Sequence, residues 1–300
     1  MTGGRLPLTV VGGYLGAGKT TLINALLADP AGERIAVLVN DFGDIDIDAR
    51  LMDSDDADVM SLTNGCICCS LADGFAEALD RIRDLAGRID RVVIEVSGVG
   101  DPRKVAQWGH VPGFTLDGVV VLVDAKTVRE RSRDRYVGET VLAQLAGADL
   151  VVVTRADLLD DTVTSEVERW LADMVAAPVL RAPVPTAVLF GPDPIGDDTL
   201  AVPEDHASTS HISMSRRFDA PVSRGSIDVW ADARPGGVVR AKGIVRVDDR
   251  PDERTVLQVC GATTTVAVDG PWDGGESAVV AIALPGTSRA AIVKWLKLLR

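Results

Sequence analysis

The residues best suited to chemistry lie in two short stretches of the N-terminal half. The first, GGYLGAGKTTLINALL (residues 12–27), is rich in glycine and contains a Lys–Thr pair. The second, LTNGCICCSL (residues 62–71), has three cysteines within four residues. A glycine-rich loop of the first kind lets backbone N–H groups approach a phosphate, and crowded thiolates are ligands for soft metal ions. A function for this chain must use both.

The phosphate loop is defined by residues 13–20, GYLGAGKT, which match the full Walker A pattern. A predicted strand (8–11) precedes it and a predicted helix (20–27) follows, which is the context that the motif requires. We expect Lys19 to reach the β- and γ-phosphates and the Thr20 hydroxyl to bind Mg²⁺, with the positive end of the helix dipole beneath them. The residues expected to contact the nucleotide here are Gly13, Gly16, Ala17, Gly18, Lys19, Thr20 and Thr21.

A second functional position is predicted at the end of the strand 92–96, which is apolar except for Glu95. Ligands of open α/β sheets bind beyond the carboxyl ends of the strands. An acid there can hold Mg²⁺ or polarise the attacking water, so Glu95 is a candidate catalytic residue. Gly98 would let the backbone approach the γ-phosphate. A strand-end acid that merely faces solvent is the alternative.

Base recognition is predicted in the segment TRAD, residues 154–157. In an N/T-K-x-D motif the aspartate accepts hydrogen bonds from guanine, which has the donors that adenine lacks. Asp157 occupies the acidic position, Thr154 supplies a hydroxyl, and Arg155 stands where lysine is expected, although arginine also stacks on a purine. ATP therefore stays an alternative to GTP, and Asp157 as a helix N-cap is an alternative to both.

The cysteine cluster consists of Cys66, Cys68 and Cys69, behind an Asn–Gly pair. Three thiolates in one loop can converge on an ion such as Zn²⁺ and leave a fourth position open, which suits a transferable ion. Buried small side chains or a redox pair are the alternatives. Cys260 lies in a strand-like piece and is interpreted as a core residue, as are Trp230, Trp272 and Trp295, unless these form a docking surface.

Composition limits the classes of function. The 300 residues are 46% hydrophobic and 25% charged, which is typical of globular proteins, and the net charge of −13 disfavours nucleic acid and anionic membranes as partners. No apolar run reaches the roughly 18 residues of a membrane-spanning helix. Adjacent cysteines are poor disulfide partners, so we expect a reducing cytoplasm.

The pattern of apolar runs predicts an α/β protein with a doubly wound, mostly parallel sheet and a smaller α+β domain after it. Buried strands are expected at 8–11, 35–39, 92–96, 119–123, 150–153 and 186–190, with a helix at 71–85. The expected domains are 1–190 and 213–300, with a linker at 191–212. In the second domain we expect strands at 226–230, 238–247, 255–260, 263–268 and 278–284, and a helix at 288–299.

The ordered set of motifs resembles the CobW-type metallochaperone GTPases, relatives of the urease and hydrogenase accessory GTPases. Besides GYLGAGKT, the resemblance rests on VNDFGDIDIDARLM (39–52), SLTNGCICCSL (61–71), EVSGVGDP (95–102) and RAKGIVRV (240–247), and it covers nearly the whole chain. It implies a P-loop GTPase domain followed by a small C-terminal domain. It also implies that the protein binds zinc or cobalt and delivers the ion to a client protein. A homodimer is a candidate assembly.

The resemblance also assigns roles. It implies that Cys66, Cys68 and Cys69 bind the transition metal, that Thr20 and Asp41 lie at Mg²⁺, and that Glu95 is the Walker B acid; Asp41 joins Lys19 and Glu95 as a catalytic candidate. The chain departs from the family in its linker, which has only His206 and His211, and in its TRAD segment. The alternatives are a metal-sensing regulator that delivers nothing and an ATP-dependent enzyme with structural zinc. No arginine finger is evident, so turnover is expected to be slow.

Overall fold

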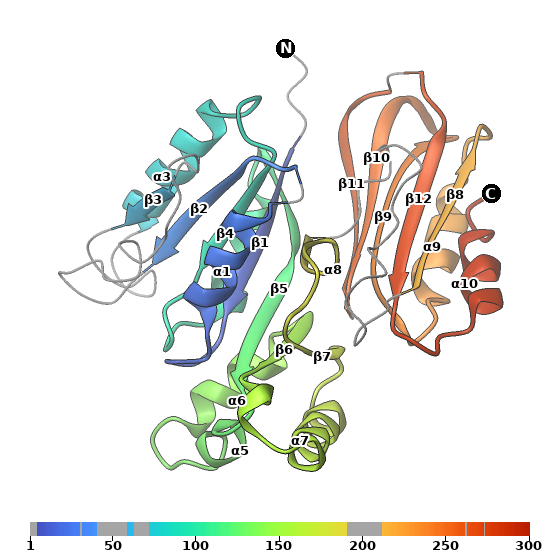
Figure 1. Ribbon diagram of the computed structural model, residues 1–300. Helices are drawn as coiled ribbons and strands as arrows, with labels where there is room; N and C mark the ends of the chain where they lie inside the picture. The colour runs from blue at the N-terminus through green and yellow to red at the C-terminus, as the bar shows by residue number, and fades with distance from the viewer. Residues whose placement is uncertain are drawn as a thin grey trace. The chain divides into compact units, whose positions relative to one another are not determined.

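The computed structural model describes residues 5–30, 32–40, 59–62, 72–190, 212–261, 263–272 and 274–300. Contacts divide the described chain into one unit of residues 5–189 and a second unit formed by Phe190 and residues 212–300. Each unit has its own sheet and its own hydrophobic core (Figure 1). The predicted linker, with His206 and His211, lies outside the described residues apart from Ile212.

The sheet of the first unit is parallel, as predicted. Over the described residues it has seven strands in the order β3-β2-β4-β1-β5-β6-β7. These are β1 (Leu6–Gly12), β2 (Ile35–Asn40), β3 (Val59–Leu62), β4 (Arg91–Glu95), β5 (Phe114–Asp124), β6 (Leu150–Thr154) and β7 (Val179–Arg181). Every residue of β4 and β5 is buried, because helices cover both faces and leave no position for a solvated side chain.

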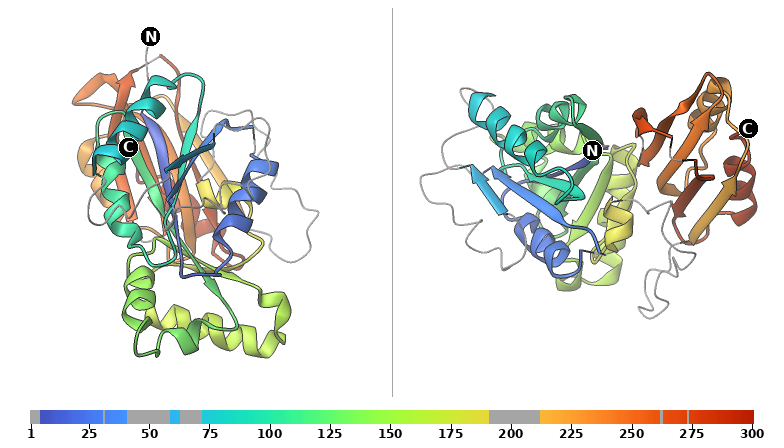
Figure 2. Two further views of the ribbon diagram at one scale, coloured as in Figure 1. Left: turned by 90° about the vertical axis from the view of Figure 1, so that its left-hand side faces the viewer. Right: turned by 90° about the horizontal axis from the view of Figure 1, so that it is seen from above.

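Helices cover this sheet on both faces. They are α1 (Lys19–Ala28), α3 (Ala72–Asp84), α4 (Pro102–Ala106), η1 (Gln107–His110), α5 (Val128–Arg131), α6 (Gly138–Ala146), η2 (Ala156–Leu158), α7 (Asp161–Met174) and α8 (Thr186–Phe190). The view from above shows α1 and α3 on opposite faces (Figure 2). The helix predicted at 71–85 is confirmed as α3, and its side chains Phe75, Leu79 and Ile82 are buried in the core.

The strand order reverses at β1. The chain leaves β1 through α1 for β2 on one side, returns to β4 next to β1, and then crosses to β5 on the other side. In doubly wound sheets such a reversal opens a crevice at the carboxyl ends of the central strands. The loop that follows β1 lies at this point.

Two predictions for the first unit were wrong. Residues 186–190 form the helix α8 rather than a strand, because Pro185 precedes them and its carbonyl accepts hydrogen bonds from the N–H groups of Val188 and Leu189. A buried apolar run this short does not distinguish strand from helix by its periodicity. No strand was predicted between residues 39 and 92, but β3 lies there and pairs with β2.

The second unit has an antiparallel sheet covered on one face by two helices (Figure 1). In the described part of this unit the strand order is β11-β10-β9-β12-β8. Its elements are β8 (Ile212–Phe218), α9 (Arg224–Asp232), β9 (Val238–Val247), β10 (Arg250–Cys260), β11 (Thr263–Pro271), β12 (Ser277–Ala283) and α10 (Arg289–Leu296). This confirms the predicted α+β class.

The two helices meet through stacked tryptophans. The rings of Trp230 on α9 and Trp295 on α10 lie 4.6 Å apart at an interplanar angle of 13°, and the Trp295 indole N–H donates to the Trp230 carbonyl. Both tryptophans and Cys260 are buried, which confirms their interpretation as core residues. Trp272 is only partly buried.

The strand predicted at 226–230 is wrong, since these residues belong to the helix α9. A strand would direct Ile227 and Val229 to the same face, but Ile227 is buried and Val229 is 53% exposed. The helical pair is Ile227 with Trp230, and Ser223 caps the helix by accepting from the Ser226 N–H. Ser223 was the helix-start signal that the sequence prediction overlooked.

Among the helices of the described chain, none is long and apolar enough to cross a membrane.

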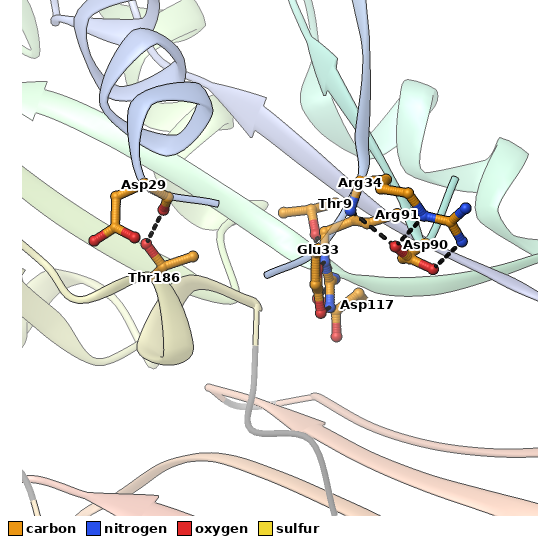
Figure 3. Close-up of polar contacts among 8 residues, drawn as sticks. All are labelled: Thr9, Asp29, Glu33, Arg34, Asp90, Arg91, Asp117 and Thr186. Atoms are coloured by element: carbon orange, nitrogen blue, oxygen red, sulfur yellow. Dashed lines mark hydrogen bonds and ion pairs between the residues drawn. The ribbon is translucent and has the colours of Figure 1, made fainter. Parts of the chain in front are cut away.

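A buried polar network joins the three central strands of the first sheet (Figure 3). Arg91, the first residue of β4, is 1% exposed and donates to Asp117 of β5 over 2.6 Å and to Glu33 before β2. The Thr9 hydroxyl of β1 donates to the same Asp117 oxygen over 3.1 Å. Burial lowers the pKa of the Arg91 guanidinium, but Asp117 and Glu33 raise it, and the net pKa lies above its ordinary value. Arg91 is therefore a charged residue inside the core.

Removal of one partner of this network should be costly. The Asp117→Ala variant should lose about 3–5 kcal/mol of unfolding free energy, because the buried Arg91 charge loses its buried counter-charge. Urea denaturation followed by circular dichroism measures this loss. The matched control is Asp90→Ala, which breaks an exposed pair with Arg34 and should cost far less, since water screens that pair. Equal losses in the two variants would contradict the importance of burial.

Candidate nucleotide-binding site

The predicted phosphate loop connects the end of β1 to the start of α1, so its strand–loop–helix context is confirmed. The loop runs so close to β5 that a Cβ atom on Gly13 would lie 2.4 Å from the Leu122 carbonyl oxygen. Only glycine fits there. Lys19 begins α1, is 8% exposed, and donates from Nζ to the Gly13 carbonyl over 3.1 Å. The Lys19 side chain thus spans the loop from its end to its start, and its ammonium group is placed to bind a phosphate held by the loop.

Thr154 holds the other end of the loop. Its hydroxyl oxygen lies 2.8 Å from the Ala17 carbonyl and 3.1 Å from the Val123 carbonyl, so its proton is donated to one or shared by both. The sequence suggested this hydroxyl for the base. In the structure it instead connects the end of β6 to the phosphate loop and to the end of β5. A carbonyl held by a hydrogen bond fixes the orientation of its peptide plane.

Glu95 ends β4 and lies directly beside β1, where its register partner is Val11. Its side chain is 2% exposed, so the solvent-facing alternative is excluded. A buried carboxylate next to a phosphate loop, together with the Thr20 hydroxyl at the start of α1, provides the hard oxygen donors that Mg²⁺ prefers. The residues present therefore fit a magnesium nucleotide.

The loop after β4 is packed against the phosphate loop at Gly98. A Cβ atom at this position would lie 2.5 Å from Cδ2 and 2.7 Å from the backbone nitrogen of Leu15. Gln144 of α6, which is 2% exposed, donates its amide to the carbonyls of Gly98 (3.2 Å) and Gly100 (2.8 Å). Sequence reasoning missed Gln144, because no motif contains it and its target is backbone 44–46 residues away.

The predicted base-reading segment follows β6. Asp157 is exposed within η2 and caps no helix, since the N-cap positions of η2 and α7 are Arg155 and Asp160. The N-cap alternative is therefore excluded. Arg155 adopts a left-handed backbone conformation (φ 54°), and its guanidinium pairs with Asp124 at the end of β5 over 2.8 Å. Its charge is thus tied to the neighbouring strand end.

The remaining candidates lie outside the described residues: Asp41, Cys66, Cys68 and Cys69. Asp41 follows directly on β2. Within the described ranges, no group of three or more His, Cys, Asp or Glu side chains is arranged to hold a metal ion. The roles of the cysteines and of Asp41 stay predictions.

Two family descriptions match the chain: "CobW/HypB/UreG, nucleotide-binding domain" matches residues 7–181, and "Cobalamin synthesis protein cobW C-terminal domain" matches residues 212–297. The chain belongs to the CobW/HypB/UreG nucleotide-binding family and carries the CobW C-terminal domain. This confirms the resemblance seen in the motifs.

Individual relatives agree with this assignment. A protein of Sinorhizobium sp named zinc chaperone CobW is 30% identical over an alignment of 343 positions covering 96% of each chain. The Escherichia coli (strain K12) protein named zinc chaperone YjiA is 35% identical over 190 positions, 60% of this chain and 57% of the relative. The crystal structure of the Zn(II)-bound YjiA GTPase from E. coli aligns over 99% of both chains at 23% identity, with a TM-score of 0.44.

The Gln144 contacts lead to a test of the loop after β4. Gln144→Met keeps the length of the side chain but removes both donated hydrogen bonds, leaving two buried carbonyls without them. We expect a loss of about 1–3 kcal/mol of unfolding free energy and faster amide hydrogen exchange in residues 97–100. Gln107→Met, at an exposed position of η1, is the control. Unchanged exchange in the Gln144 variant would contradict the tether.

Proposed function

We propose that this protein is a GTP-hydrolysing metallochaperone. It binds a divalent transition metal, zinc or cobalt, through Cys66, Cys68 and Cys69 and delivers it to a client metalloprotein under nucleotide control. The observation that carries the proposal is the phosphate loop with Glu95 and Gly98 beside it, in a chain that aligns over 96% of its length with a zinc chaperone. The alternative, a metal-sensing regulator, would bind metal and a partner but would deliver no metal to it.

The nucleotide side of the proposal rests on the geometry of the loop. Lys19 lies across it, Thr154 holds its outer edge, and Gly98 closely approaches Leu15. Bound Mg²⁺ would neutralise charge on the phosphates, and Thr20, Asp41 and Glu95 would hold it. Lys19 and the backbone N–H groups would orient the γ-phosphate for attack by water, which is catalysis by position and charge.

The metal side rests on the chemistry of the thiolates. Soft sulfur donors favour Zn²⁺ over hard ions, and three ligands leave a position through which the ion can be passed on. Here the ion is cargo. Residues 1–190 would carry the nucleotide and metal loops, 191–212 would be a linker, and 213–300 would form the second domain. The reducing cytoplasm would keep the thiolates available.

The proposal requires the two sites to be coupled. Asp41 follows β2, and Cys66 follows β3, the strand paired with β2. We expect the chain between β2 and α3 to act as a switch region that γ-phosphate and Mg²⁺ would hold in place. Metal should therefore bind about 5–150-fold more tightly in the presence of a non-hydrolysable GTP analogue than with GDP. A competition titration of Zn²⁺ against a chromophoric chelator measures both affinities.

Controls separate ligands from coupling. Cys68→Ala should lose metal affinity, whereas Cys260→Ala changes a buried core thiol and should retain it. Lys19→Ala should abolish the nucleotide dependence but leave the basal metal affinity. Identical affinities in the two nucleotide states of the wild type would contradict nucleotide control, and transfer of Zn²⁺ to an apo-enzyme would then be the remaining test of delivery.

Guanine recognition by Asp157 predicts a switch in base preference. The carboxylate would accept from N1–H and the exocyclic amino group of guanine. Asp157→Asn replaces one acceptor oxygen with an N–H₂ donor, which matches the carbonyl of xanthine. Calorimetry should show weaker GTP binding and stronger xanthosine triphosphate binding than in the wild type. The control is Asp160→Asn, a nearby acid whose side chain caps no N–H. Equal wild-type affinities for ATP and GTP would exclude guanine specificity.

A further inference from the structure

An arginine absent from every motif contacts the phosphate loop. Arg131 ends α5, which follows β5 at the carboxyl edge of the sheet. Its Nη1 donates to the Leu15 carbonyl over 2.6 Å, and its guanidinium lies 5.1 Å from the centre of the Tyr14 ring. The contact spans 116 positions of sequence. The side chain is fixed against the first half of the phosphate loop by a hydrogen bond and a cation–π contact.

The hydrogen bond sets the direction of a peptide group. In a trans peptide the C=O and N–H bonds point in opposite directions. Since the Leu15 carbonyl faces Arg131, the Gly16 N–H points to the side of the loop opposite Arg131. Thr154 orients the Ala17–Gly18 peptide in the same manner. Its hydroxyl binds the Ala17 carbonyl, so the Gly18 N–H points away from Thr154.

We propose that Arg131 is a positioning residue for hydrolysis of the nucleotide, acting through the Leu15–Gly16 peptide; the inference rests on the proposed GTPase function. In that reaction a water oxygen bonds to the γ-phosphorus and the bond to the β–γ bridging oxygen breaks. The electron pair stays on that oxygen of GDP, one proton of the water leaves with inorganic phosphate, and the other passes to solvent. Arg131 holds the Gly16 N–H toward the oxygen that gains charge.

Charge makes this contact more than a loop anchor. A guanidinium that donates to a carbonyl polarises the peptide, and its N–H becomes a stronger donor. Across the described residues, Arg131 forms no ion pair with a carboxylate, whereas Arg129 of the same helix lies near Glu166. Among the residues that the structure describes, no acid therefore cancels the positive charge beside the loop. A donor aimed at developing charge lowers the barrier more than it strengthens ground-state binding.

The test compares three variants of the full chain. Arg131→Ala removes the donor and the charge, Arg131→Lys keeps a charge and a donor but not the planar contact, and Arg133→Ala removes a neighbouring exposed arginine as control. The measurements are kcat and KM for GTP, the Kd for GDP, and the Kd for GDP with aluminium fluoride, a mimic of the transferring phosphoryl group. Thermal unfolding checks that each variant is folded.

We expect Arg131→Ala to lower kcat roughly 10–100-fold and to weaken GDP–aluminium fluoride binding in parallel. This is less than the roughly 100–1,000-fold for complete loss of an oriented donor, because the Gly16 N–H stays in the loop and loses only the contact that orients it. The Kd for GDP should change less than about threefold, since GDP has no bond to break. Arg131→Lys should recover part of kcat, and Arg133→Ala should match the wild type.

Two results would overturn the inference. If Arg131→Ala keeps the wild-type kcat, the contact has no role in the reaction. If it weakens GDP and GDP–aluminium fluoride by the same factor, Arg131 only supports the loop. A wild-type protein that binds and hydrolyses no GTP would instead overturn the proposed function together with this inference, so the two failures are distinguishable.

Discussion

Parallel pairing of β1 with β4 and β5 is the constraint on which the site depends. The pairs Val11 with Glu95 and Gly12 with Val121 fix which backbone atoms meet at the carboxyl edge. A shift of one residue would reverse every side chain on a strand. It would move Glu95 away from its position beside the phosphate loop, and it would replace the Gly13 contact with a clash.

The site is built mainly from backbone held by distant side chains. Thr154, Gln144 and Arg131 each donate to carbonyls of the phosphate loop or of the loop after β4. Bound carbonyls fix peptide planes, and fixed planes direct N–H groups. Donors oriented before a ligand arrives cost no reorganisation when charge develops. Glycines permit the close approach, but the tethers from β6, α6 and α5 decide the direction.

At the opposite end of the sheet, a few buried polar contacts hold the strands themselves together. Arg91, Asp117 and Thr9 connect β4, β5 and β1 inside the core, where a charge is tolerated only with partners. Asp117 lies at the register shift between β1 and β5, next to Gly118. The network therefore lies at an irregularity in the strand pairing, where Thr9 and Arg91 bind the side chain of Asp117.

The sequence was sufficient to predict the local features of this protein: the buried strands around β1, the phosphate loop, the acid that ends β4, and the family. These follow from short-range patterns, since apolar runs, glycine spacing and caps act within a few residues. It did not determine α8 or α9. The five-residue segments 186–190 and 226–230 each fit a helix or a strand, and for α9 the burial of Trp230 and the exposure of Val229 identify the helix. Only the tertiary structure brought Arg131, Gln144 and Thr154 to the loops. Their partners are carbonyls, which every residue has, so no residue type in the sequence marks the contact.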